Sequence, residues 1–307
     1  MALQDPYDLC LSRENARRQK RRGGQHEAKT GMQENTFRVR FWGVRGSLPV
    51  SGEQFLRYGG NTPCIEVRCG SEVLIFDAGS GLREAGLALM AEGVAEYDVF
   101  FTHTHYDHII GLPYFKPIYR CSSAVRFWSG HLHGTMSTQE MINDFMRPPW
   151  FPVGPGICQA SLDCVDFRPG ETLSPRKGVS IRTMSLVHPG GCVGYRVDWG
   201  GRAVALIYDT EHEAGILDPT LLEFIAGADL MVYDCTYLES EMPTYRGYGH
   251  STGMHGAKLA QAAGVPRLAM FHHDPSRTDV EIAAMEEEVQ AFFEGAFAAR
   301  DHQIIEL

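Results

Sequence analysis

The chain has 307 residues, 44% of them hydrophobic and 21% charged, a composition that excludes a disordered or fibrous protein and is sufficient for one large core. Its net charge is −10, from 28 Lys and Arg against 38 Asp and Glu, so a long nucleic acid is disfavoured as a partner. No apolar run approaches the roughly 20 residues of a membrane-spanning helix, and no secretory signal is evident. The eight cysteines contain no C-x-x-C pair, which favours reduced thiols over a disulfide framework. We therefore expect a cytoplasmic protein with no membrane partner.

Residues 1–35 differ in composition from the rest of the chain. Six basic residues fall between Arg13 and Arg22, with Glu14 alone opposing them, and two glycines follow. A short charge run near a terminus is typical of a solvated, flexible segment. We expect a flexible basic tail at 1–35 and a single domain at 36–307.

Short β-branched and aromatic runs bounded by Gly, Pro or Asp predict strands, which outnumber the helical patterns. The predicted strands cover residues 37–42, 64–69, 73–76, 98–102, 125–128, 179–187, 194–198, 203–208, 230–233, 268–271 and 303–305. The predicted helices cover residues 82–92, 138–146, 220–226, 253–263 and 279–299. Because the early strands form meander-like pairs, two packed sheets with helices outside are favoured over a doubly wound parallel sheet.

The most informative segment directly follows the apolar run at 97–101 and has the sequence THTHYDH, residues 102–108. If the chain leaves the strand in extended form, His103 and His105 project the same way, because side chains repeat every two residues, so both imidazoles can meet one ion. A turn then presents Asp107 and His108, whose donors suit a second ion of zinc, iron or manganese. Three histidines and an aspartate in six residues predict a metal site.

Further side chains of ligand type follow other predicted strands. They are His188, Asp209, His272 and His273. Each alone is ordinary loop chemistry. Their recurrence at the same end of successive strands indicates that they share a site.

The H-x-H-x-D-H run, followed in order by His188, Asp209 and a late histidine, resembles the metallo-β-lactamase superfamily over residues 37–307. The resemblance implies an α+β fold, a four-layer αββα sandwich, with two divalent metal ions at one edge of the sheets. Zinc is the usual ion, and manganese or iron are alternatives. In the implied ligand set, one ion is held by His103, His105 and His188, the other by Asp107, His108 and His272, and Asp209 bridges them. The segment FDAGSG at 76–81 is similar to the family's first motif, whose aspartate, here Asp77, supports the ligand loop.

Later motifs resemble the phosphodiesterase branch of this superfamily, which includes ribonuclease Z and the phosphoribosyl cyclic phosphodiesterases. They are YDCTY at 233–237, GHST at 249–252 and MFHH at 270–273, with FWGVRGS at 41–47 and YGGNT at 58–62. The resemblance implies that His250 contacts the scissile phosphate and that the ligand is His272 rather than His273, because it directly follows the strand. Two features depart from the branch. The long Gly/Pro-rich basic arm of the tRNA-processing members is missing, and so is the cysteine cluster of the phosphoribosyl enzymes.

These features predict a hydrolase that cleaves a small phosphodiester, such as a cyclic nucleotide or cyclic phosphate, by attack of a metal-bridging hydroxide. Asp107 would orient the nucleophile or accept its proton, and His250 would donate a proton to a phosphate oxygen or to the leaving group. Ser251 and, as a weaker candidate, Arg45 would contact the substrate.

Several alternatives stay open at this point. His250 is alternatively a turn residue, with Ser251 or Thr252 capping the next helix. A thioesterase or lactonase on the same fold is the main alternative function, and an RNA-processing nuclease ranks below it. A redox protein with iron at these ligands would need an electron partner or a flavin domain. A homodimer is compatible with the sequence, and Trp150 with Phe151 is either a packed crossover or an aromatic lid.

Overall fold

The computed structural model describes residues 35–307, so the basic run of the predicted tail lies outside the described residues. Among the described residues, no helix combines the length and apolar character needed to cross a lipid bilayer. Six of the cysteines in this part are free. Cys121 is disulfide-bonded, which corrects the expectation of a reduced thiol at this position.

The first of two seven-stranded sheets has the order β14-β1-β2-β3-β4-β5-β6. Strands β14, β1, β2 and β3 pair antiparallel, whereas β3 to β6 are parallel. The strands are β1 Phe37–Gly43, β2 Cys64–Cys69, β3 Glu72–Phe76, β4 Glu96–Phe101, β5 Ala124–Ser129, β6 Ser161–Asp166 and β14 Ile304–Glu306.

The second sheet has the order β13-β12-β11-β10-β9-β8-β7. Its first part, β7 to β10, is antiparallel, and β10 to β13 are parallel. The strands are β7 Thr172–Leu173, β8 Ser180–Leu186, β9 Cys192–Trp199, β10 Arg202–Ile207, β11 Leu230–Asp234, β12 Leu268–Phe271 and β13 Ala296–Ala298.

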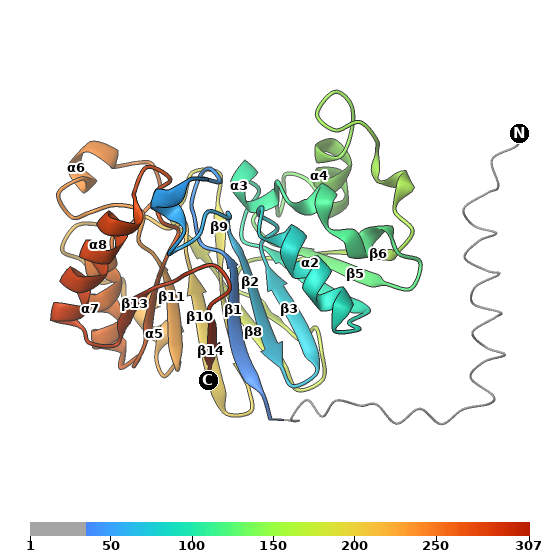
Figure 1. The fold of residues 1–307 in the computed structure, drawn as a ribbon. Helices are drawn as coiled ribbons and strands as arrows, with labels where there is room; N and C mark the ends of the chain where they lie inside the picture. The colour runs from blue at the N-terminus through green and yellow to red at the C-terminus, as the bar shows by residue number, and fades with distance from the viewer. Residues whose placement is uncertain (1–34) are drawn as a thin grey trace, which may run out of the picture. The chain divides into compact units, whose positions relative to one another are not determined.

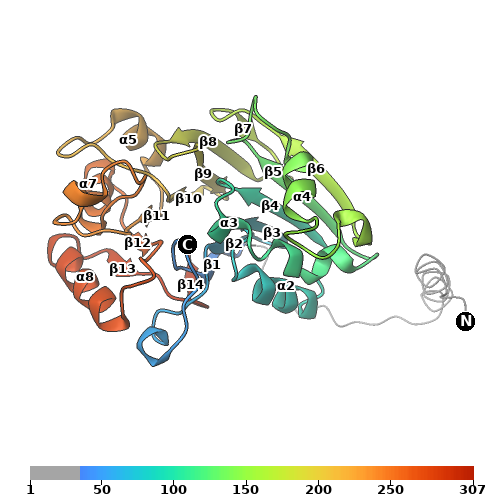
Figure 2. The ribbon, with the colours of Figure 1, turned by 90° about the horizontal axis from the view of Figure 1, so that it is seen from above.

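Helices cover the outer face of each sheet (Figures 1 and 2). The α-helices are α2 Leu82–Ala91, α3 Tyr106–Ile109, α4 Thr138–Phe145, α5 Pro219–Ile225, α6 Met242–Tyr245, α7 Gly253–Ala263 and α8 Asp279–Phe292. The 3₁₀ turns are η1 Glu53–Phe55, η2 Leu112–Tyr114, η3 Lys116–Tyr119 and η4 Pro155–Ile157. Helices α4 and α8 begin at capping boxes, in which the hydroxyl of Ser137 or Thr278 and the glutamate three residues later satisfy the free backbone amides of the first turn.

Three apolar clusters hold these layers together. Between the sheets, side chains such as Phe76, Phe100 and Tyr195 form the central core. A second cluster fills the space between the first sheet and α2 and α4, and a third fills the space between the second sheet and α5, α7 and α8. Buried apolar surface is the main stabilising contribution in such layers. The predicted four-layer αββα sandwich is confirmed.

The prediction of one long helix at 279–299 is wrong beyond Phe292. Gly295 follows, and a Cβ there would lie 2.1 Å from the carbonyl oxygen of Pro266, so the chain turns tightly at this point. The alanine-rich run after it becomes β13, which pairs in parallel with β12. Strand pairing therefore overrides the high helix propensity of alanine.

The topology brings the C-terminal ends of five strands together at one edge of the molecule. These strands are β4, β8, β10, β11 and β12, and the predicted ligand residues follow four of them. The loop after β1 reaches the same edge, where the amide of Gly46 donates to the carbonyl of His273 over 2.9 Å. Residues far apart in the sequence are thus assembled into one site.

Candidate metal centre

The segment after β4 turns at His105, which is extended and precedes α3. As the alternation predicts, His103 and His105 reach the same cluster, together with His188 from the loop after β8. Their ligand atoms all lie within 4.8 Å of one another, and Nε2 of His188 is 3.1 Å from Nδ1 of His105. Three imidazoles in this arrangement could hold one metal ion.

A second group lies beside the first and consists of Asp107, His108 and His272. Oδ2 of Asp107 is 3.2 Å from Nε2 of His108 and 3.3 Å from Nε2 of His272. His272 takes a positive φ of 61°, a conformation that is strained for a residue with a Cβ. Surrounding contacts therefore hold the ring in place at a conformational cost.

Asp209 lies between the two groups. Its Oδ2 is 3.7 Å from Nε2 of both His103 and His188, and its Oδ1 is 3.4 Å from Nε2 of both His108 and His272. Asp209 also has a positive φ, 56°. One carboxylate thus faces four imidazoles, as expected of a residue that bridges two ions.

Hydrogen bonds behind the histidines fix which ring nitrogen faces the cluster. Buried Asp77 accepts from Nδ1 of His108 over 2.8 Å and from the amide and hydroxyl of Thr102 over 2.7 and 2.8 Å. The same hydroxyl lies 3.1 Å from Nδ1 of His103. Both rings therefore direct Nε2 at the site, and the supporting role expected of Asp77 is confirmed.

The second sheet supports its histidines in the same way. Nδ1 of His188 donates to the carbonyl of Gly249 over 2.8 Å, and Nδ1 of His272 is 2.9 Å from Oγ1 of Thr236. The amide of Ser47, in the loop after β1, donates to Oδ2 of Asp107 over 2.8 Å. These supporting residues sit outside the ligand motif, so sequence pattern alone does not reveal them.

The cluster fits a pair of divalent cations. Nε2 of His103, Nε2 of His108 and Oδ1 of Asp209 are buried and lack a hydrogen-bond partner among residues 35–307. Buried polar atoms are normally hydrogen-bonded, so three unpaired nitrogen and oxygen atoms at one point are typical of side chains that bind a metal ion. Burial lowers the pKa of His103 well below its ordinary value, which keeps the ring neutral, the form that binds metal. The nitrogen and carboxylate donors suit zinc, manganese or iron.

His250 faces the same cluster from the segment before α7. Its ligand atom lies within 4.8 Å of those of His188 and Asp209, and its Nδ1 is 2.8 Å from Oδ2 of Asp234. Burial lowers the pKa of His250, but the Asp234 carboxylate outweighs that effect and raises the pKa to about 9. Burial raises the pKa of Asp107, but the neighbouring His108 and His272 lower it well below its usual range. The site thus pairs a protonated imidazole with an ionised carboxylate.

The two remaining substrate-contact candidates are placed differently from expectation. The buried guanidinium of Arg45 donates to the carbonyl oxygens of Gly59 and Arg277 over 2.8 and 2.7 Å, so it holds loops together and does not face the site. Ser251 is also buried, and its hydroxyl bonds to the side chains of His212 and Tyr233. Neither placement supports the expected substrate contact, because Arg45 bonds to main-chain oxygens and approaches Oδ1 of Asp279 through Nη2 at 3.8 Å, and Ser251 bonds to core side chains.

Other residues singled out in the sequence have structural roles. The ring of His273 donates to the carbonyl of Ala299 over 3.0 Å, which accounts for the choice of His272 at the cluster. Thr252, not Ser251, is the N-cap of α7. Phe151 packs against the core, whereas Trp150 is 74% exposed. A further residue near the site, which the sequence pattern does not single out, is His131, whose Nε2 lies 3.1 Å from the hydroxyl of Thr104 in the ligand motif.

Comparison with known proteins agrees with this geometry. The family described as "Beta-lactamase superfamily domain" matches residues 73–273, more than half of the chain. A curated relative, ribonuclease Z of Bradyrhizobium sp. (strain ORS 278), is 26% identical over 315 residues, which cover 86% of this chain and 98% of the relative.

Two solved structures share the fold at low sequence identity. The metallo-beta-lactamase fold protein YhfI from Bacillus subtilis has a TM-score of 0.69 and is 17% identical, with 89% of this chain and 100% of that chain covered. A diphosphatase from the PhnP family has a TM-score of 0.63 and is 17% identical, with 88% of this chain and 97% of that chain covered. The fold, the matched family and the ribonuclease Z relative agree with one another, and the chain belongs to the metallo-β-lactamase superfamily of hydrolases.

Proposed function

We propose that the protein is a metal-dependent phosphodiesterase that hydrolyses a small nucleotide-like diester, with two divalent ions, zinc first among them, at the candidate metal centre. Bound there, the ions would supply Lewis acidity and a water acidified toward neutral pH. The observation that carries the proposal is His250, which is held by Asp234 and faces the two ligand groups. A phosphodiester has a poor alkoxide leaving group, so a proton donor opposite the nucleophile is useful for this reaction.

The protein's own residues have distinct tasks in this proposal. The imidazolium of His250 donates a hydrogen bond to a non-bridging phosphate oxygen or a proton to the departing oxygen, and Asp234 keeps the ring oriented and charged. The ionised Asp107 carboxylate accepts a hydrogen bond from the attacking water and orients it. Asp209 lies between the two ligand groups, with one carboxylate oxygen toward each, and would fix their separation.

Aromatic rings beside His250 support a nucleoside in the substrate. Tyr237 contacts His250 edge-on with ring centroids 5.8 Å apart, and stacks on Tyr245 at 4.5 Å. Tyr245 in turn meets Tyr248, which is 61% exposed. Exposed aromatic faces next to a phosphate site offer stacking for a base, an interaction worth about 1–3 kcal/mol.

The ribonuclease Z relative favours a second candidate, cleavage within RNA. The net charge of −10 opposes this candidate, because counterion release from a long polyphosphate needs a basic surface. A thioesterase or lactonase remains the alternative from another class, and His250 opposes it, because a carbonyl hydrolase has no evident need for this donor.

The test is a substrate panel with purified protein loaded separately with zinc, manganese and iron. The panel holds bis(p-nitrophenyl) phosphate, 2′,3′- and 3′,5′-cyclic nucleotides, a thioester, a lactone and a tRNA precursor. We expect turnover of the small diesters, and a loss of about 10²- to 10⁴-fold in His250→Ala but none in the surface control His133→Ala. Turnover restricted to the tRNA precursor, or to the carbonyl substrates, would replace the proposal with the corresponding alternative.

A further inference from the structure

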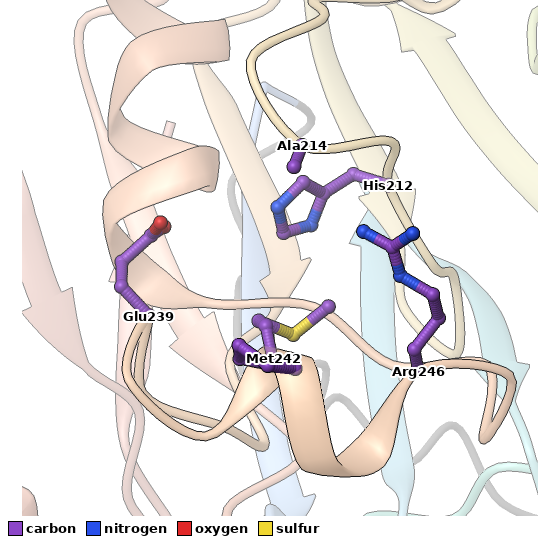
Figure 3. A pocket seen from close by; sticks show the side chains of 6 residues that line it. His212, Ala214, Glu239, Met242 and Arg246 are labelled. Atoms are coloured by element: carbon purple, nitrogen blue, oxygen red, sulfur yellow. The ribbon is translucent and has the colours of Figure 1, made fainter.

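A cavity that the proposed chemistry does not use lies between the loop after β10 and the segment around α6. It has a volume of about 340 Å³ and is lined by His212, Ala214, Glu239, Met242, Pro243 and Arg246. Figure 3 shows the ring of His212, from the loop after β10, and the guanidinium of Arg246 near one another, with Met242 on the α6 side and Glu239 across from them. An adjoining hollow shares three of these residues and adds Lys258 of α7.

Both walls of the cavity are tied to the metal centre. His212 follows the bridging candidate Asp209 by three residues, so their Cα atoms are at most about 11 Å apart. From the same loop as His212, the Glu211 carboxylate accepts from the amides of Gly247 and Gly249 on the other wall over 2.8 and 2.9 Å. The carbonyl oxygen of Gly249 accepts a hydrogen bond from Nδ1 of His188. These contacts place the cavity beside the metal centre.

Arg246 supplies an uncommitted positive charge. Its side chain is exposed and makes no hydrogen bond or ion pair with another residue in the described range 35–307. Glu239 also lines the cavity; its Oε1 accepts from the hydroxyl of Thr252 over 2.5 Å, and it makes no ion pair with Arg246. A guanidinium without a partner in a cavity is suited to a bidentate contact with phosphate.

The second donor is His212. Its hydrogen bonds determine which of the two ring nitrogens carries the proton. The buried hydroxyl of Tyr233 lies 2.9 Å from Oγ of Ser251, which lies 2.6 Å from Nδ1 of His212. Every hydrogen in this chain finds an acceptor only if Tyr233 donates to Ser251 and Ser251 donates to Nδ1. Nδ1 is then an acceptor, and the proton of the neutral ring is on Nε2. His212 therefore has one N–H left for a ligand.

We propose that this cavity binds a second phosphate of the substrate, a terminal phosphomonoester, through Arg246 and the Nε2–H of His212. The preferred substrate class is thus a nucleotide diester that carries a terminal phosphate. This inference rests on the proposed function and makes it more specific. Met242 and Pro243 also line the cavity and suit the apolar face of a sugar or base.

The kinetic test compares two dinucleotides, ApA and pApA, which share the scissile diester and differ only in the terminal phosphate. We expect the metal-loaded protein to prefer pApA by about 10- to 100-fold in kcat/KM, through KM. Arg246→Ala should abolish the preference, Arg246→Lys should restore part of it, and neither should change the rate with bis(p-nitrophenyl) phosphate. Arg83→Ala, an exposed arginine on α2, is the matched control.

Equal rates for ApA and pApA in the parent protein would overturn the inference and leave the phosphodiesterase proposal standing. A loss of rate on all three substrates in Arg246→Ala would also overturn it, because Arg246 would then serve the scissile phosphate. If no diester is hydrolysed, the proposed function fails, and calorimetric binding still decides the inference. Adenosine 5′-monophosphate should bind at least tenfold more tightly than adenosine in the parent but not in Arg246→Ala, and equal preference in both proteins would refute the second phosphate site.

Discussion

The substitution Gly46→Ala tests how closely the geometry of the metal centre depends on the loop after β1. A Cβ at this position would lie 2.2 Å from Cε1 of His272, 2.3 Å from Nδ1 and 2.8 Å from Nε2. Neither partner can move freely, because the amide of Gly46 donates to His273 and the amide of Ser47 donates to Asp107. In Gly46→Ala the ring of His272 must therefore retreat by roughly 1 Å, a displacement that costs about 10²-fold in rate when it affects an active-site group.

We expect Gly46→Ala to stay folded, to lose affinity for one of two bound ions and to hydrolyse bis(p-nitrophenyl) phosphate about 10²-fold more slowly. Elemental analysis after dialysis gives the metal content, and circular dichroism checks the fold. Gly156→Ala is the control, because a Cβ there meets no atom within 4 Å. Two tightly bound ions and full activity in Gly46→Ala would refute the assignment of His272 to the centre.

Three further predictions address the support of the site, its pH dependence and the stability of the fold. Thr102→Val removes the hydroxyl that links Asp77 to the first ligand histidine, so metal affinity should fall about 10- to 100-fold by competition with a chelator, and unchanged affinity would contradict this supporting role. Burial raises the pKa of Asp301 to about 7, so between about pH 4 and 7 the folded protein keeps a proton that the unfolded chain releases, and the free energy of unfolding falls as the pH rises. Urea titrations should show Asp301→Asn gaining stability relative to the parent by up to about 1.4 kcal/mol per pH unit in that window, and a pH-independent difference would disprove it. Thr278→Ala removes the N-cap of α8 and should cost about 1 kcal/mol in urea titrations with turnover unchanged, whereas altered turnover would place the cap in the active site's support.

The sequence pattern predicts the main strands well, because each buried strand is an apolar run between Gly, Pro or Asp. The edge strand β6, Ser161–Asp166, escapes prediction because half of its sequence, SLDCVD, is polar and the strand pairs with one neighbour only. The region after Phe292 is mispredicted for the opposite reason. Its alanines favour a helix locally, and contacts with β12, distant in sequence, decide the outcome.

Within the site, predictable and unpredictable residues differ in how their role is encoded. The ligand candidates carry chemistry that is rare in a short segment, so the run from His103 to His108 is visible without a structure. The role of a supporting residue depends on which distant group it touches. Thr236 reaches His272 because β11 lies beside β12, and Asp234, at the end of β11, meets His250 from the segment before α7.

Under the proposed function, phosphodiester hydrolysis requires two metal ions at this cluster. The most direct measurement removes all metal with a chelator, returns zinc, manganese or iron in small steps, and records bound metal and the rate with bis(p-nitrophenyl) phosphate at each step. We expect the folded apoprotein to be inactive and activity to reach its plateau at about two bound ions per chain. An undiminished rate in the folded, metal-free protein, or a plateau with no bound ion, would contradict it.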